Sequence, residues 1–356
     1  MTAPIHVAAS NIHGLGASQL VQSLLPALAT VARERIGTVF VPDTGPLGAL
    51  AADLGLTTAV VRRRLPNAVS RVIECLASSY YYPVAGDMLV LGDVPLAVPG
   101  KQVLLVHRPH MVSGADAGSV SGNAKVAVSR WLFRRNASRV DRAIVQSDVM
   151  AGELRDNFPE LGDRIRIIPQ PAPEWLAGAA RARTDWAGER PLRLFYPASP
   201  YPHKNHGLLD DYAARFGAGS GVQIILTLDA GGRDLPPPLA PVGLQDAKGM
   251  RAQYAGADAL LFPSLDESFG LPLVEAMMLG LPILVAERPY ARSLCGDAAI
   301  YFDPSSAASL DGAIGELRRR LSAGWAPDYA ERLAIIPRDW DDVARQMVAL
   351  FDENLA

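Results

Sequence analysis

Cysteine and lysine are both scarce in this chain. Its 356 residues include two cysteines, Cys75 and Cys295, too few for a disulfide framework and not grouped with other metal ligands as in a structural zinc site. We expect both to be small buried apolar residues. Against many arginines, the lysines number four, so a lysine in a candidate site stands out; they are Lys101, Lys125, Lys204 and Lys248.

Long apolar runs and a strong net charge are missing too. No run of about 18 apolar residues occurs, and Met1–Val7 lacks the basic and apolar stretches of a secretion signal. The formal net charge of −3 gives no general attraction to nucleic acid. We therefore predict a cytoplasmic protein without a nucleic-acid partner.

The chain is long enough for two domains of roughly 150 residues each. Short apolar β-rich runs alternate with longer helical patterns in both halves, which predicts α/β domains with two doubly wound parallel sheets. The expected strands lie near residues 5–9, 37–41, 57–61, 88–91, 102–106, 143–146, 164–168, 192–196, 222–228, 257–262, 282–286 and 299–302.

Prolines indicate where the two domains meet. Three of them in Ile168–Trp175 forbid a helix and favour an extended connector, so we expect domains at 1–170 and 171–339. The proline-rich Leu235–Leu239 is interpreted as a surface loop. A last helical pattern within 340–356 could pack back on the first domain, with one apolar face made of Val343, Met347, Leu350 and Phe351.

One segment, Phe262–Gly280, has the features of a ligand site. A strand ends at Phe262, an acidic loop follows, and a helix begins near Pro272. Gly270 permits close approach of a ligand to the backbone, and free amides at a helix start favour an anion such as a diphosphate. Glu275, one turn into the helix, either complements the helix dipole or binds a polar group such as a ribose diol.

The run from Glu267 to Glu275 resembles the E-x7-E motif of retaining glycosyltransferases of family 4, and the similarity continues through Gly280–Ala286 and Cys295–Pro304. The resemblance, to enzymes of the bacterial cell-surface polysaccharide type, implies the GT-B fold. In that fold two Rossmann-like domains face a central cleft. The first binds the acceptor and the second binds the nucleotide-sugar donor.

The resemblance also implies roles for individual residues. Glu267 would face the donor sugar, Glu275 would bind the ribose, and Lys204 would neutralise the phosphates as the leaving group gains charge. The remaining donor contacts would come from Ser268, Phe269, Gly270 and Leu271. Ser199 also falls in the donor site, in the region where the family usually supplies a second cation. His203 and Arg288 are the two candidates to supply that charge instead, and the sequence does not choose between them.

In the first half, Gly14 and Gly16 lie in Ser10–Ser18, a segment that directly follows the first strand and opens a helical pattern. Their spacing is not that of the dinucleotide fingerprint, which counts against an NAD enzyme. By resemblance, this loop reaches the donor. His107 ends the strand at 102–106, and the family implies a catalytic histidine near the transferred sugar. A hydrogen-bonded structural histidine is the alternative.

Arginines stand beside large apolar residues in Arg130–Arg139 and in Arg62–Leu65. Such patches can contact anionic lipid headgroups, which would suit a lipid-linked acceptor and a peripheral position on the inner face of the membrane. We favour the other interpretation, a solvated helix face whose Trp131, Leu132 and Phe133 pack into the core.

Together with these patterns, the resemblance implies a retaining hexosyltransferase that needs no metal or other cofactor. It would move a sugar from a nucleotide-diphosphate donor, with GDP-mannose favoured, to a glycan or lipid-linked acceptor. Two alternatives remain: a sugar-nucleotide epimerase of the same architecture, and a binding protein that retained the nucleotide-sugar site without turnover.

Overall fold

The computed structural model describes residues 3–12, 15–62, 67–108, 123–176, 186–229, 231 and 234–353. The chain divides into two compact units. Unit 1 comprises Met1–Pro171 and Pro337–Ala356, and unit 2 comprises Ala172–Ile336. The first segment of unit 1 thus ends inside the proline-rich connector, one residue after the expected domain end, and the C-terminal segment returns to unit 1.

Unit 1 is built on a parallel sheet of seven strands in the order β3-β2-β1-β4-β5-β6-β7. Every residue of β1, β5 and β6 is buried, as expected for parallel strands covered on both faces. The strands are β1 (Ile5–Ala8), β2 (Ile36–Pro42), β3 (Thr58–Val61), β4 (Asp87–Val90), β5 (Gln102–Leu105), β6 (Arg142–Val145) and β7 (Ile165–Ile167).

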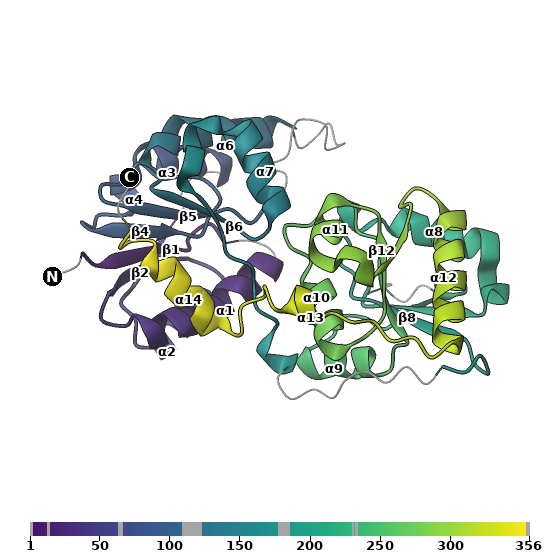
Figure 1. Ribbon diagram of the computed structural model, residues 1–356. Helices are drawn as coiled ribbons and strands as arrows, with labels where there is room; N and C mark the ends of the chain where they lie inside the picture. Colours follow the sequence, from purple (N-terminus) through teal and green to yellow (C-terminus); the bar gives the residue numbers. More distant parts are fainter. Residues whose placement is uncertain are drawn as a thin grey trace. The chain divides into compact units, whose positions relative to one another are not determined.

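Helices cover both faces of this sheet (Figure 1). One apolar core lies between the sheet and the first, second and last helices, and another lies under the remaining ones. The helices are α1 (Leu15–Val31), α2 (Leu47–Asp53), α3 (Asn67–Leu76), α4 (Ser78–Tyr81), α6 (Asn123–Asn136), α7 (Asp148–Asn157) and α14 (Trp340–Ala349).

The C-terminal helix α14 lies beside α1 (Figure 1). The four residues expected on its apolar face are all buried, together with Trp340. The run Asp339-Trp340-Asp341 has the spacing of a metal-binding Asp-x-Asp. Here, however, Asp339 caps the helix, because its Oδ1 accepts a hydrogen bond from the Asp342 amide at 2.8 Å.

Unit 2 contains a parallel sheet of six strands in the order β10-β9-β8-β11-β12-β13. Its strands are β8 (Leu192–Tyr196), β9 (Val222–Leu226), β10 (Leu239–Pro241), β11 (Ala259–Phe262), β12 (Ile283–Ala286) and β13 (Ile300–Phe302). Its helices are α8 (His206–Phe216), α9 (Ala247–Ala255), α10 (Leu271–Leu279), α11 (Pro289–Cys295), α12 (Ala307–Ser322) and α13 (Ala330–Leu333).

The predicted pair of doubly wound parallel sheets is confirmed, and each expected strand has a counterpart within two residues of its expected bounds. Strand β10 was not expected. It begins at Leu239, the last residue of the proline-rich segment interpreted as a loop. It lies at the edge of the sheet. An edge strand tolerates proline because one row of its backbone groups needs no partner.

In each sheet the strand order reverses once, between β1 and β4 in unit 1 and between β8 and β11 in unit 2. Ligands of open α/β sheets bind outside the carboxyl ends of the strands at such a reversal. The loops after β8 and β11 in unit 2, and after β1 and β4 in unit 1, are therefore the places to look for a site.

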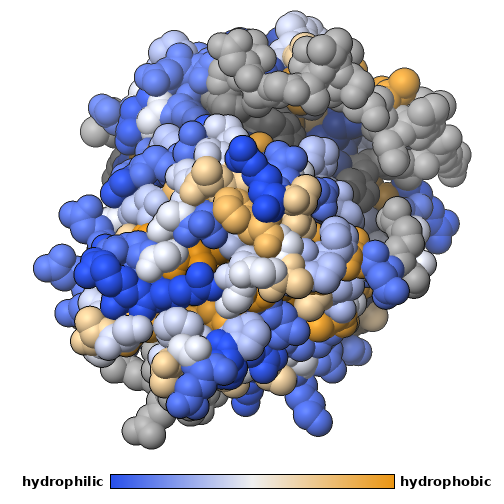
Figure 2. All heavy atoms as spheres, turned by 90° about the vertical axis from the view of Figure 1, so that its right-hand side faces the viewer, coloured by the Kyte–Doolittle hydropathy of each residue, from blue (hydrophilic) through white to orange (hydrophobic). Residues whose placement is uncertain are grey.

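The surface on the side of α8 and α12 is mostly hydrophilic, with small apolar groups between the charged residues (Figure 2). Within the described ranges, no helix is both long enough and apolar enough to cross a membrane.

Candidate functional site

The loop after β8 holds Lys204 firmly at the strand reversal of unit 2. Tyr196, the last residue of β8, donates a hydrogen bond from its hydroxyl to the Lys204 carbonyl at 2.7 Å. The next residue, Asn205, has a left-handed backbone (φ 56°). Its side-chain amide donates to the carbonyls of Pro263 at 3.3 Å and Pro304 at 2.9 Å. These contacts tie the lysine loop to the loops after β11 and β13.

The loop after β11 brings Glu267 to the same point. The Lys204 ammonium and the Glu267 carboxylate form an ion pair across the reversal, with side chains only 11% and 15% exposed. The buried Ser264 hydroxyl also donates to Glu267 Oε1 at 2.6 Å. The ammonium lies 5.2 Å from the centre of the Phe262 ring. Two residues that are 63 positions apart in sequence thus meet where a ligand of this fold binds.

Helix α10 begins beside this ion pair with its first turn uncapped by any side chain. Its N-cap is Gly270, which has φ 94°, a conformation that side-chain-bearing residues rarely adopt. Pro272 occupies the first turn, where its missing N–H costs nothing. The start of this helix therefore offers backbone amides and the positive end of the helix dipole to an anion.

Glu275 is buried in the second turn of α10, with 7% of its surface exposed. Its Oε2 accepts a hydrogen bond of 2.5 Å from the hydroxyl of Tyr254 on α9. Burial raises the pKa of the Glu275 carboxyl to about 7, although the Tyr254 hydrogen bond acts in the opposite direction. Glu275 is therefore a buried carboxyl and not one at a solvated helix end, and its ribose contact stays a prediction.

Tyr254 is a site residue that the sequence analysis missed. It is fully buried, stacks on Trp175 with 6.0 Å between ring centres and meets Phe195 edge to face at 4.9 Å. Burial, followed by the nearby Glu275 charge, raises its pKa well above the usual value, so the phenol stays a donor. No spacing links positions 254 and 275, because the contact depends on how α9 packs against α10.

Two further titratable groups stand beside the ion pair. Burial, and then the charge of Glu267, raises the pKa of Asp266. Burial lowers the pKa of His203, whose ring stacks on Tyr201 at 5.7 Å. A neutral His203 is a poor replacement for the second cation of the family.

The second cation was expected near Ala198 and Ser199 in the loop after β8, and neither of these residues is cationic. The Ser199 carbonyl accepts a hydrogen bond from the His206 ring at 2.8 Å, and the Ala198 carbonyl accepts one from Thr227 at 2.9 Å. Arg288 instead lies after β12, on the edge of a cavity of about 430 Å³.

In unit 1, His107 follows β5 and is held by Asp93, which follows β4. Asp93 is 2% exposed and has a left-handed backbone (φ 63°). Its Oδ1 accepts from the amides of His107 at 2.7 Å and Arg108 at 3.2 Å, and it lies 3.2 Å from His107 Nδ1. Within the described chain both ring nitrogens of His107, Nδ1 and Nε2, are buried without a hydrogen-bond partner.

Gly14 and Gly16 are the two glycines expected in the loop after the first strand. Gly14 lies outside the described residues. Gly16 is in the first turn of α1 and is exposed, and a Cβ added there would meet no atom of the described residues within 4 Å. Packing within unit 1 thus does not require glycine at position 16.

A buried polar cluster at the end of β1 was not expected from the sequence. The Glu74 carboxylate, fully buried, accepts from the hydroxyls of Ser10 at 2.8 Å and Tyr82, and it pairs with Arg71 at 2.9 Å. The Arg71 guanidinium also donates to the Gly92 carbonyl at 3.0 Å. This cluster links α3 to the strand reversal of unit 1.

The basic segment on α6 divides between core and surface. Leu132 and Phe133 are buried, as the favoured interpretation predicts, but Trp131 is 53% exposed, so its predicted burial is wrong. The helix turns Trp131 to the same exposed side as Arg134 and Arg135. Arg63, Arg64 and Leu65 of the second basic segment lie outside the described residues.

Within its described part, the structure holds no group of three or more histidine, cysteine or acidic residues that could hold a metal ion.

Comparisons with known proteins bear directly on unit 2. Residues 242–319, which include β11, α10 and both glutamates, match the family model for glycosyl transferases group 1.

Among curated proteins, the chain is similar to the O-antigen chain mannosyltransferase RfbU of Salmonella typhimurium, with 33% identity over 28% of this chain and 27% of that protein. It is also similar to the MMP alpha-(1->4)-mannosyltransferase of Mycolicibacterium hassiacum, with 24% identity over 65% of this chain and 60% of the relative. The matches therefore span about a quarter and three fifths of the length of these relatives.

A solved structure of Anabaena Alr3699/HepE in complex with UDP and glucose superimposes with a TM-score of 0.58 and 15% identity. The superposition covers 98% of this chain and 97% of that one. The chain has the GT-B fold of its structural neighbours. The family-model match and the mannosyltransferase relatives support a glycosyltransferase.

Proposed function

We propose that this chain is a retaining glycosyltransferase of family 4 that takes a sugar from a nucleotide-diphosphate donor bound on unit 2. The observation that carries the proposal is the meeting of Lys204, Glu267 and the uncapped start of α10 at the strand reversal, with Glu275 buried one turn further on. A cation, free amides and a carboxylate are the groups that a diphosphate and a ribose need.

In this proposal the diphosphate binds at the amides of Phe269, Gly270 and Leu271 and at the Lys204 ammonium. Lys204 leaves its pairing with Glu267 when the phosphates arrive. The leaving group gains negative charge as the glycosidic bond breaks, and a cation fixed in place stabilises that charge most. Glu267, freed from the ammonium, then faces the donor sugar.

Glu275 accepts hydrogen bonds from the ribose hydroxyls as a carboxylate, with Tyr254 holding its Oε2. No metal is required in this scheme, because Lys204 and the helix amides carry the charge. The proposed role of unit 1 is to bind a glycan or lipid-linked acceptor, and His107 is the residue through which we propose that unit 1 takes part in the reaction.

The mannosyltransferase relatives favour mannose as the transferred sugar, whereas the structural neighbour was solved with UDP and glucose. We propose GDP-mannose, transfer to a cell-surface polysaccharide precursor, and a cytoplasmic location with peripheral contact to the membrane. The exposed Trp131 beside Arg134 and Arg135 supports that contact.

The test is to incubate the full chain with GDP-, UDP- and ADP-linked sugars, with and without polyprenyl-linked glycan acceptors, and to measure release of nucleoside diphosphate. We expect release from one donor class, accelerated by acceptor and unaffected by EDTA, with the anomeric configuration retained in the product. Tight nucleotide binding with no release from any donor would instead indicate a binding protein.

A further inference from the structure

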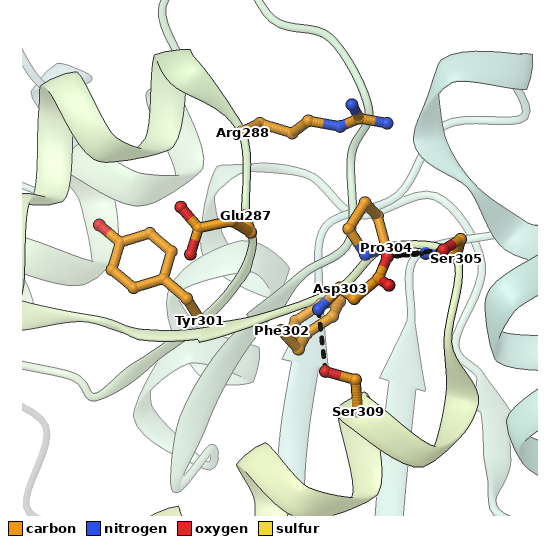
Figure 3. Close-up of a pocket in the computed structure, with 8 residues that line it drawn as sticks. All are labelled: Glu287, Arg288, Tyr301, Phe302, Asp303, Pro304, Ser305 and Ser309. Carbon is orange, nitrogen blue, oxygen red and sulfur yellow. Dashed lines mark hydrogen bonds between the residues drawn. The ribbon is translucent and has the colours of Figure 1, made fainter.

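Arg288 is a cation whose surroundings do not satisfy it. It directly follows β12 at the carboxyl edge of the sheet and precedes α11. Its Nε is buried without a hydrogen-bond partner, and within the described chain no acidic group forms an ion pair with it. Figure 3 shows its side chain extending away from Glu287 and Tyr301 toward the side of the cavity that holds Pro304 and Ser305.

The two acidic residues that line this cavity are engaged elsewhere. Glu287 binds Arg292 through both carboxylate oxygens, one of them at 2.5 Å, and this pairing lowers its pKa. Asp303 accepts from the Ser305 hydroxyl at 2.6 Å and from the Ser305 amide at 2.9 Å. Neither carboxylate forms an ion pair with Arg288, although Arg288 lies close enough to Asp303 to contribute to the lowering of its pKa after the Ser305 hydrogen bonds. The guanidinium therefore keeps hydrogen-bond donors for an anion in the cavity.

Three contacts place this cavity next to the Lys204 loop. Pro304 lines it, and the Pro304 carbonyl accepts the Asn205 side chain at 2.9 Å. Tyr290, two residues after Arg288, donates to the Ser264 carbonyl at 2.7 Å. Arg288 is also close enough to Asp266 for its charge to lower the pKa of that carboxyl against the larger effect of burial.

The charges at this edge show why a second cation matters. Lys204 is neutralised by Glu267, and Asp266 adds a further acidic group. Besides the α10 amides and Lys204, which Glu267 neutralises before a donor binds, Arg288 adds a full positive charge for a diphosphate, which carries at least two negative charges. A guanidinium can bind phosphate oxygens with two parallel hydrogen bonds, which a lysine cannot do.

We propose that Arg288 binds the diphosphate of the nucleotide donor and supplies the positive charge that the loop at Ala198 and Ser199 lacks. The inference rests on the proposed function, since it assigns a further binding residue to the same site. It also predicts a preference for nucleoside diphosphates over monophosphates that depends on this one side chain.

The experiment is isothermal titration of the full chain with GDP, UDP and the corresponding monophosphates, for the wild type, Arg288→Ala and Arg288→Lys. The matched control is Arg319→Ala, an exposed arginine of α12 that pairs with Glu316 within its own helix. We expect Arg288→Ala to weaken diphosphate binding about tenfold or more, with little change for the monophosphate. Arg288→Lys should fall between, and Arg319→Ala should bind as the wild type does.

The outcomes separate the two proposals. A wild type that binds neither diphosphate contradicts the proposed function itself. A wild type that binds a diphosphate, with Arg288→Ala equally tight or with mono- and diphosphate weakened alike, overturns the role of Arg288 and leaves the proposed function standing. Melting temperatures of all variants show whether each is folded. If Arg288→Ala is not, Arg288→Lys decides, since an unchanged preference for the diphosphate then counts against the role.

Discussion

The hydroxyl of Tyr254 donates a 2.5 Å hydrogen bond to Oε2 of Glu275, and this pair lies buried between α9 and α10. This hydrogen bond explains how a buried carboxyl group is accommodated in the second turn of α10. The tyrosine satisfies one oxygen without adding a positive charge. Burial raises the pKa of the Glu275 carboxyl to about 7, against the opposite effect of the Tyr254 hydrogen bond.

The first prediction concerns stability. Since the pKa of Glu275 is higher in the folded chain than its ordinary 4.5, the folded state holds the proton more tightly. The resulting stabilisation is complete below about pH 4.5 and is lost as pH rises to about 7. We expect Glu275→Gln to gain roughly 3 kcal/mol of stability relative to the wild type between pH 4.5 and pH 8. Urea unfolding at both pH values measures this, and a pH-independent difference would contradict it.

A second prediction concerns the Lys204 ammonium. Lys204→Met should lower the rate of nucleoside diphosphate release from the donor by roughly a hundredfold or more, because charge on the leaving group is no longer stabilised. Lys248→Met, which removes an exposed lysine of α9, is the control and should react as the wild type does. Equal rates for the two variants would exclude Lys204 from the reaction.

The third prediction tests the glycine at the start of α10. Gly270→Ala forces a side chain into a backbone with φ 94°, and its Cβ would approach Leu273 Cδ1 to 3.1 Å. We expect a loss of roughly 1–3 kcal/mol. By contrast Gly312→Ala, inside α12 with open space around its Cβ, should stabilise the chain by about 0.5–1 kcal/mol. Thermal unfolding of both variants checks the sign of each effect.

The fourth prediction separates chemistry from donor binding. His107 and Asp93 belong to unit 1, whereas the proposed nucleotide contacts belong to unit 2. His107→Gln and Asp93→Asn should therefore slow transfer while the affinity for nucleoside diphosphate changes less than about threefold. Titration and rate measurements on the same preparations test this. A fall in affinity as large as the fall in rate would show that His107 does not act in the way proposed.

The sequence predicts the sheets well because buried parallel strands leave a strong local pattern of short apolar runs. The sequence does not predict β10, because the three prolines at positions 236–238 suggest a loop. A strand is possible there because β10 lies at the edge of the sheet. The sequence also indicates Lys204, Glu267 and Glu275, because their spacing and neighbours resemble a known motif, and their roles stay predictions.

The partners of these residues could not be predicted in the same way. Tyr254 contacts Glu275, and Asp93 contacts His107, only because separate elements pack together. Arg288 was one of two candidates for the second cation, and its orphaned Nε and the charges around it emerge only from the fold. Trp131 was expected in the core because apolar residues usually are, yet its place on α6 exposes it.

The most direct test of the account is a crystal structure of the full chain with the nucleoside diphosphate that binds most tightly. We predict phosphate oxygens within hydrogen-bond distance of the amides at the start of α10 and of Lys204 Nζ, which will have left Glu267, with the ribose hydroxyls on Glu275. A nucleotide bound elsewhere, with the Lys204–Glu267 ion pair intact and Glu275 without a ribose contact, would contradict it.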